Sequence, residues 1–321
     1  MEKSTKSLIK HITDFLEYCE VEKGLSQLSV KNYARFIEIF QHWLIHNKLG
    51  NIKPHELSSD HIWKYRVFLS RYVNPDTKRG LKKTTQNYYL IALRNLLGYL
   101  ADKDIISVPV DKVKLLKEAK KDRIVKFLSL EQLQKLLSMP DIKTKTGLRD
   151  RAILEVLFST GLRVAELTSL NINQINFKDL YKTNSYELTI IGKGDRPRTV
   201  YFSQRALYWL KKYLEKRKDN DKALFINYHP LKNNEHRLTT RSVERMVNKY
   251  SKMAGLPVMV TPHTIRHTYA TDLLNQGVDL RIIQEFLGHK DISTTQVYTH
   301  VTSKKLKDIH KKFHSGNKLE E

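Results

Sequence analysis

Apolar residues recur every three or four positions through the first hundred residues, which is the spacing of amphipathic helices. The pattern predicts four helices: from about Thr5 to Lys23 with a stop at Gly24, from Ser29 to Lys48, a third capped by Ser59 or Asp60, and a fourth opened by Thr84 or Thr85. Helices of this length with short connections predict one compact bundle. Cys19 lies on an apolar stripe, so we expect it in the core.

The second half of the chain has a different pattern, in which helices surround one short hairpin. Ser129 and Gln132 form a capping-box pattern at a helix start. The apolar residues of 186–202 alternate on either side of a glycine-rich turn, which predicts a β-hairpin. Further helices are predicted at Arg149–Ser159, Gln204–Arg217, Thr240–Ala254, Pro262–Gln276, Leu280–Leu287 and roughly Ser293–Lys312.

Residues 109–126 interrupt both patterns, since Pro109 opens a charged and weakly periodic stretch. We interpret this stretch as a linker between a helical domain at 1–108 and a second domain at 127–321. The predicted fold class is therefore mainly α with a small antiparallel β-sheet. A basic linker between basic domains fits a clamp closed on a duplex, and it equally fits a solvated connector.

The charge balance points to a polyanionic partner. Lys and Arg number 57 against 34 Asp and Glu, for a net charge of +23. The excess is spread over both halves, which favours nucleic acid over a localised targeting signal, although a generally basic surface is the alternative. The single cysteine excludes an intramolecular disulfide and a cysteine metal cluster. The polar start and the lack of a long apolar stretch lead us to expect a cytoplasmic protein without membrane partners.

His263 and Arg266 lie three residues apart near a helix start behind Pro262, so they share one face of that helix. A helix N-terminus favours phosphate, and a guanidinium binds two of its oxygens at once. An ordinary basic surface gives the same spacing, so this pair alone decides little.

Three other places complete a candidate site. After Gly161, Arg163 is expected in the first turn of a new helix, with Glu166 three residues later. Lys193 lies at the predicted hairpin turn, where a lysine reaches a DNA groove or is merely solvated. His289 follows the helix-ending Gly288, and Tyr298, one of 16 tyrosines, comes shortly afterwards.

Together these residues suit one reaction. Cleavage of a phosphodiester without metal needs a nucleophile, cations on the non-bridging oxygens and an acid for the leaving oxygen. Two arginines, two histidines, a lysine and a tyrosine supply these groups. No carboxylate cluster of the kind that holds catalytic magnesium stands out, and we expect no metal and no cofactor.

In this order the residues resemble the tyrosine recombinase (phage integrase) family, in its simple, Xer-like form. The resemblance rests on four stretches, which are Thr160-Gly-Leu-Arg-Val-Ala-Glu-Leu167, the Gly-Lys-Gly turn at Lys193, His263-Thr-Ile-Arg-His-Thr-Tyr-Ala-Thr271 and Leu287-Gly-His-Lys-Asp-Ile-Ser-Thr-Thr-Gln-Val-Tyr-Thr-His-Val301. It covers nearly the whole chain. It implies an N-terminal four-helix, SAM-like core-binding domain and a catalytic domain that form a C-shaped clamp on DNA, without the additional arm-binding module of other members.

The resemblance also implies roles. Tyr298 is the nucleophile that forms a 3′-phosphotyrosine, Arg163 and Arg266 hold the phosphate, and His263 accepts the tyrosine proton. Lys193 protonates the leaving 5′-oxygen, and His289 adds a hydrogen bond to the phosphate. Glu166 supports this machinery, and neither ATP nor metal is required.

The implied partners are a specific duplex site and a homotetramer that holds two duplexes through a Holliday junction. A stripe of Leu306, Ile309 and Phe313 is expected to dock in trans on a neighbour or to pack on its own domain. Arg241 and Arg245 are weaker candidates for DNA contact. Chromosome or plasmid dimer resolution is the preferred role, and mobile-element integration or excision is the alternative. A type IB topoisomerase and a DNA-binding protein without catalysis are the rival functions, and an accessory protein remains open.

Overall fold

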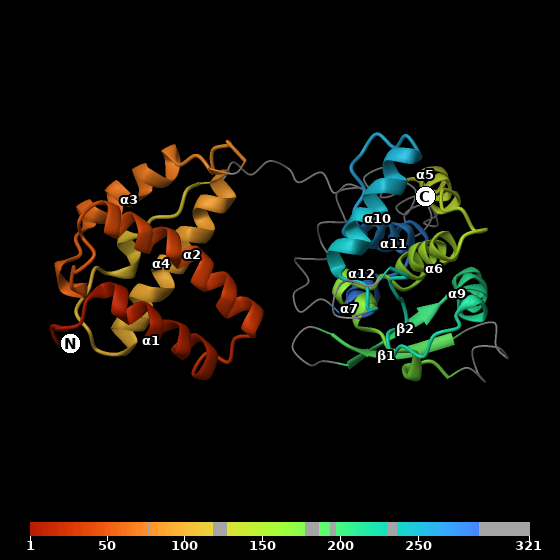
Figure 1. The fold of residues 1–321 in the computed structure, drawn as a ribbon, viewed down its shortest axis with the longest axis horizontal. Coiled ribbons are helices and arrows are strands. Elements are labelled where there is room, and N and C mark those ends of the chain that lie inside the picture. Colours follow the sequence, from red (N-terminus) through yellow and green to blue (C-terminus); the bar gives the residue numbers. More distant parts are fainter. Residues whose placement is uncertain (76, 118–126, 177–185, 193–196, 230–235, 289–321) are drawn as a thin grey trace, which may run out of the picture. The chain divides into compact units, whose positions relative to one another are not determined.

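A computed structural model describes residues 1–75, 77–117, 127–176, 186–192, 197–229 and 236–288. The chain forms two compact units, 1–122 and 123–321. Both are mainly helical, and the sheet of the described residues is one antiparallel pair of strands (Figure 1). The mainly α fold class with a small sheet is confirmed. Within the described segments, no helix combines the length and apolar character that crossing a membrane requires.

The first unit is a bundle of the four predicted helices. They are α1 (Leu8–Val21), α2 (Gln27–His46), α3 (Ser59–Arg71) and α4 (Lys83–Asp102), with short 3-10 turns at Pro54–Glu56 and Val110–Lys112. Helices α1, α2 and α4 pack against one another, and the core contains Phe15, Phe40 and Tyr65. Cys19 is buried there, as predicted.

The helix starts in this unit differ from the predicted ones. Helix α3 is capped by Ser58, whose hydroxyl accepts a hydrogen bond from the backbone N–H of His61. Sequence alone does not distinguish Ser58 from its neighbours Ser59 and Asp60, because all three are good capping residues. Helix α4 begins behind Lys82, which makes no side-chain cap, so the predicted threonine opening is wrong by about one residue.

Part of the predicted linker packs on the first unit. Val113 is buried in its core, and Leu115 and Leu116 pack against it. The Asn87 side chain also exchanges two hydrogen bonds with the backbone of Leu116. The lysines of this stretch therefore alternate with apolar anchors as far as residue 117. The domain limits at 108 and 127 and the clamp around DNA stay predictions.

The second unit is built around one helix. Its elements are α5 (Leu130–Ser138), α6 (Lys145–Thr160), α7 (Val164–Ser169), a 3-10 turn at Ile172–Gln174, β1 (Tyr186–Ile191), β2 (Pro197–Phe202), α9 (Gln204–Lys216), α10 (Thr240–Met253), α11 (Pro262–Asn275) and α12 (Leu280–Leu287). Helix α6 contacts α5, α9, α11 and β2 (Figure 1). Every residue from Gly147 to Leu157 is buried. The capping box of Ser129 and Gln132 is confirmed.

Two features of the second unit bear on the site. Strand β1 pairs with β2 so that Ile190 lies opposite Arg198, and β2 also packs against α6 and α12. Helix α6 begins four residues before its predicted start. Gly147 lies in the added turn, and a Cβ atom there would lie 2.0 Å from the backbone oxygen of Asp141, so this close approach requires glycine.

Candidate active site

The end of α6 and the start of α7 create the first part of the site. Gly161 ends α6 with φ of 60°, and a Cβ atom at this position would lie 2.6 Å from the Tyr269 ring. Both the left-handed backbone and the close ring favour glycine. Arg163 is the N-cap residue of α7, which corrects its predicted place in the first turn. Its backbone is therefore extended, and its side chain is not confined to a helix face.

The Glu166 carboxylate holds the arginines at the start of α7. It is buried, and it accepts hydrogen bonds from the backbone N–H of Arg163 at 2.7 Å and from Nη1 of Arg163 at 2.9 Å. Arg198 donates two more, at 2.8 and 2.7 Å. Burial alone raises the pKa of Glu166, but the bonds from Arg198 and Arg163 outweigh it and lower that pKa to about 2. Glu166 is thus a fixed anion at neutral pH.

Arg163 also bonds to the end of α12, where its Nη2 donates to the backbone oxygen of Gly288 at 3.1 Å. Its side chain is 27% exposed, compared with 9% for Arg198. The guanidinium is therefore held from behind by protein oxygens while part of it faces solvent.

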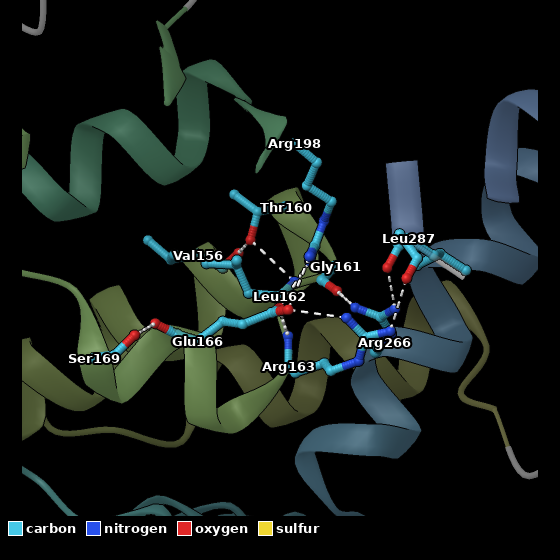
Figure 2. Close-up of polar contacts among 11 residues, drawn as sticks. Val156, Thr160, Gly161, Leu162, Arg163, Glu166, Ser169, Arg198, Arg266 and Leu287 are labelled. Carbon is cyan, nitrogen blue, oxygen red and sulfur yellow. Dashed lines mark hydrogen bonds and ion pairs between the residues drawn. The ribbon is translucent and has the colours of Figure 1, made fainter. Parts of the chain in front are cut away.

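Arg266 is buried and bonds to the ends of two helices. Its Nη1 donates to the backbone oxygen of Gly161 and its Nη2 to that of Leu287, both at 2.5 Å. Figure 2 shows Arg266 between these two carbonyls and beside Arg163. Carbonyls at helix C-termini lack helical partners and carry partial negative charge, so they suit a guanidinium. The last turns of α6 and α12 thereby gather both predicted arginines.

His263 lies in the first turn of α11 and is exposed. Partial desolvation lowers its pKa, and the charges of Arg266 and Arg163 lower it further, against an opposing effect of Glu244. The imidazole is therefore neutral at neutral pH and able to accept a proton. The next histidine, His267, has its pKa lowered to about 4, mainly by burial and then by His263 and Arg266.

Arg198 is the residue of this site that sequence reasoning missed. It lies on β2, two and four residues before the buried Val200 and Phe202. The alternation of a strand puts all three on one face, so a charge on the inward face was the available signal. Its partner, Glu166, is 32 residues earlier in the chain and was not predictable from spacing.

The remaining predicted residues divide into two groups. Arg241 and Arg245 are exposed on α10 and are not among the residues that hold Arg163 and Arg266. Lys193, His289 and Tyr298, and the stripe of Leu306, Ile309 and Phe313, lie outside the described residues. Along the chain, Lys193 follows Gly192, and His289 follows Gly288.

The described part of the site suits an anion. Two guanidiniums anchored on protein oxygens lie near a neutral imidazole, and one of them is partly exposed. Such an arrangement binds a tetrahedral oxyanion such as a phosphate group, with little rearrangement when its charge grows.

Comparison with known proteins covers both units. Residues 126–305 match the model of the phage integrase family, and residues 12–104 match that of the phage integrase N-terminal SAM-like domain. The chain is 36% identical over 311 residues to tyrosine recombinase XerD of Listeria monocytogenes, covering 94% of this chain and 98% of that protein. It is 33% identical to tyrosine recombinase XerC of Thermodesulfovibrio yellowstonii, covering 97% and 98%.

The fold is also found in solved structures. A crystal structure of the XerH site-specific recombinase bound to its difH substrate superposes with a TM-score of 0.72 at 22% identity, covering 96% of this chain and 98% of that one. Sequence and fold therefore agree over almost the whole length, and the chain belongs to the phage integrase family of tyrosine recombinases.

Proposed function

We propose that this chain is a site-specific DNA recombinase that cleaves and rejoins duplex DNA through a 3′-phosphotyrosine. The observation that carries the proposal is the pair Arg163 and Arg266, held around the ends of α6 and α12 beside a neutral His263. These groups match the demands of a phosphodiester transition state. Relatives named tyrosine recombinases, at about one-third identity over most of the chain, support the same reaction.

In the proposed step the hydroxyl oxygen of Tyr298 bonds to phosphorus while the bond to the 5′-oxygen breaks. His263 accepts the phenolic proton, and Lys193 donates a proton to the departing 5′-oxygen. Arg163, Arg266 and His289 bind the non-bridging oxygens. The reverse step, with a 5′-hydroxyl from a second duplex as the attacking group, restores the phosphodiester and frees Tyr298. The energy of the broken bond is kept in the phosphotyrosine, so the step consumes no ATP.

The proposed assembly has two domains on each duplex. Residues 1–108 form the core-binding domain, 109–126 the linker and 127–321 the catalytic domain. We propose four protomers on two duplexes, with the stripe of Leu306, Ile309 and Phe313 docked on a neighbour. Arg241 and Arg245, exposed on α10, are proposed to contact the DNA backbone.

Dimer resolution of chromosomes or plasmids is the biological role that we favour, because the relatives reported above carry Xer names over 94% or more of this chain. Integration or excision of a mobile element is the second candidate.

A pool of nicked duplexes with randomised sequence tests the chemistry and finds the site. A nick next to the scissile phosphate lets the short fragment that carries the freed 5′-hydroxyl diffuse away, so covalent protein–DNA complexes accumulate. We expect Tyr298→Phe to abolish the covalent complex and to keep DNA binding, and Tyr208→Phe to change neither. Tyr208 is a matched control because it is 50% exposed on α9 of the same unit. A Tyr298→Phe protein that still becomes attached would overturn the proposal.

Two further measurements separate the rivals. Binding without any covalent complex identifies a catalytically inactive DNA-binding protein. Relaxation of supercoiled DNA by monomers at high dilution, without preference for a site, identifies a topoisomerase.

Lys193→Ala should slow cleavage, and a 5′-thiol leaving group should restore it because that group leaves without a proton. Absence of rescue would remove Lys193 from the acid role.

A further inference from the structure

Arg198 occupies an unusual place for a charged residue. It lies on the inward face of β2, its side chain is 9% exposed, and its neighbour across the hairpin is the buried Ile190. A buried guanidinium costs stability unless it is paired and hydrogen-bonded. Its partner is Glu166, to which Nη1 and Nη2 donate side by side at 2.8 and 2.7 Å.

The two-pronged contact fixes the orientation of the Glu166 carboxylate. Each oxygen of that carboxylate receives one bond from Arg198 and one from Arg163 (Figure 2). A bidentate arginine–carboxylate pair is planar and geometrically specific. The carboxylate, once fixed, sets both the backbone and the guanidinium of Arg163. Arg198 thus determines where Arg163 presents its exposed end.

A second contact links Arg198 to Arg163 from the other side. A Cβ atom on Gly288 would lie 2.9 Å from Cδ of Arg198, so the arginine stem lies directly against this glycine. The oxygen of Gly288 in turn accepts a bond from Nη2 of Arg163. Nearby, Tyr201 of β2 packs edge-on against Phe286 of α12, with ring centroids 5.9 Å apart. Strand β2 therefore contacts both groups that hold Arg163, the Glu166 carboxylate and the end of α12.

We propose that Arg198 is a positioning residue for DNA cleavage. It acts through Glu166 and Gly288 to hold Arg163 against the scissile phosphate and makes no contact with the DNA itself. The inference rests on the proposed function, since it assigns Arg198 a part in the same cleavage step. Arg198 also connects β2, which follows Lys193 in the chain, to Gly288, which precedes His289. The proposed reaction requires Lys193 and His289 at the same phosphate.

The first test compares Arg198→Met with Arg151→Met on the nicked substrate. Arg151 is a matched control, because its side chain is 9% exposed like that of Arg198 and it also pairs with a buried carboxylate of the same unit, Glu155. We expect Arg198→Met to lower the rate of covalent capture by about 10–100-fold, the effect of a misplaced group, with DNA affinity within a few-fold of wild type. Arg151→Met should leave the rate of the folded protein nearly unchanged. Arg198→Lys keeps the charge and loses the fork, so it should restore only part of the rate.

A double-mutant cycle with Arg163→Lys shows whether Arg198 acts through Arg163. If it does, Arg198→Met slows the Arg163→Lys protein much less than it slows wild type. If the two effects multiply in full, Arg198 acts independently and the proposal is wrong. Equal rates for folded Arg198→Met and Arg151→Met, with capture still dependent on Tyr298, also contradict it. Loss of the dependence on Tyr298 would instead contradict the proposed function.

A variant that keeps every charge covers the case in which Arg198→Met does not fold. Gly288→Ala places a methyl group against the Arg198 stem, and Gly255→Ala is its control. Both glycines have φ of 62°, but nothing lies within 4 Å of a Cβ on Gly255. We expect capture by the folded proteins to slow at least several-fold more for Gly288→Ala than for Gly255→Ala, because only the first methyl group displaces the Arg198 stem. Equal rates for the two alanine variants would overturn the proposal.

Discussion

Two buried carboxylates of the second unit, Glu166 and Glu155, are each held by two arginines, yet only one of them belongs to the site. Glu155 accepts from Nε of Arg151 at 2.9 Å and from Nε of Arg205 at 2.8 Å. Glu166 is held by Arg163 and Arg198. In both clusters one arginine is largely buried and the other is partly exposed.

The difference lies in what surrounds each arginine. Arg151 is covered by the Trp209 ring, with its guanidinium carbon 4.5 Å from the ring centroid, and it donates to the backbone oxygen of Leu137. That cluster ties α6 to α5 and α9. At Glu166 the exposed Arg163 instead lies near Arg266 and His263, at the ends of two helices. The arginine of an ion pair can bind an external anion when it is partly exposed and lies beside other cationic or hydrogen-bonding groups, as Arg163 does.

Arg163 and Arg151 lie three and four residues before their carboxylates in the chain. Removal of Arg163 should mainly slow cleavage, and removal of Arg151 should mainly lower stability. We expect Arg163→Ala to slow covalent capture by at least about 100-fold, because a donor to the transition-state charge is lost. Its unfolding free energy should fall by only about 1 kcal/mol, because Arg163 is partly exposed and Glu166 keeps the buried Arg198. We expect Arg151→Ala to lower the unfolding free energy by about 3 kcal/mol, the cost of breaking a buried pair. Capture by folded Arg151→Ala protein should stay near wild type.

Urea titrations and capture rates of the same samples measure both effects. The comparison fails if Arg151→Ala slows capture as much as Arg163→Ala at a temperature at which both proteins are folded. It also fails if Arg163→Ala is the less stable of the two proteins, because Glu166 would then be primarily a structural centre.

The local half of the site was predictable from sequence. Arg163 with Glu166, and His263 with Arg266, are spaced three residues apart at helix starts, where local geometry brings side chains together. Gly161 marked the helix break correctly because a left-handed end favours glycine. Among the described residues, the helices and the hairpin were predicted to within a few residues, because periodic spacing and capping residues are local signals. The helix predicted at about Ser293–Lys312 lies outside the described residues.

The distant half of the site was not predictable. Arg266 bonds to Gly161, 105 residues earlier, and to Leu287, 21 residues later. These acceptors are backbone carbonyls, which carry no residue-specific signal. Arg198 carried a weak signal, a charge on the inward face of a strand, but its partner is set by the packing of β2 against the rest of the unit.

The pH dependence of stability should reveal the Glu166 cluster. Because the folded-state pKa is lowered to about 2 from an ordinary 4.5, Glu166 stabilises the fold above pH 4.5 and loses that contribution as the pH falls toward 2. The shift corresponds to about 3 kcal/mol. We expect the unfolding free energy of Glu166→Gln to depend less steeply on pH than that of wild type between pH 4.5 and 2.

Arg198→Met sharpens this measurement. Since the bond from Arg198 is the largest of the contributions that lower the pKa of Glu166, its removal should move the loss of stability to higher pH. Chemical denaturation at each pH gives the three curves. Parallel curves for wild type and Glu166→Gln from pH 5 to 2 would show that folding does not lower the pKa of Glu166.

The smallest expected effect is a change in the pKa of His263, and the direction of that change is the test. The positive charge of Arg163 contributes to the lowered pKa of His263, so Arg163→Met should move the imidazole midpoint upward in an NMR titration. Arg151→Met belongs to the other cluster and should leave the midpoint in place. Glu244 acts in the opposite sense, so Glu244→Gln should move it downward. A midpoint that follows Arg151 and ignores Arg163 would separate His263 from the phosphate-binding arginines, and the proton acceptor would then have to be sought elsewhere.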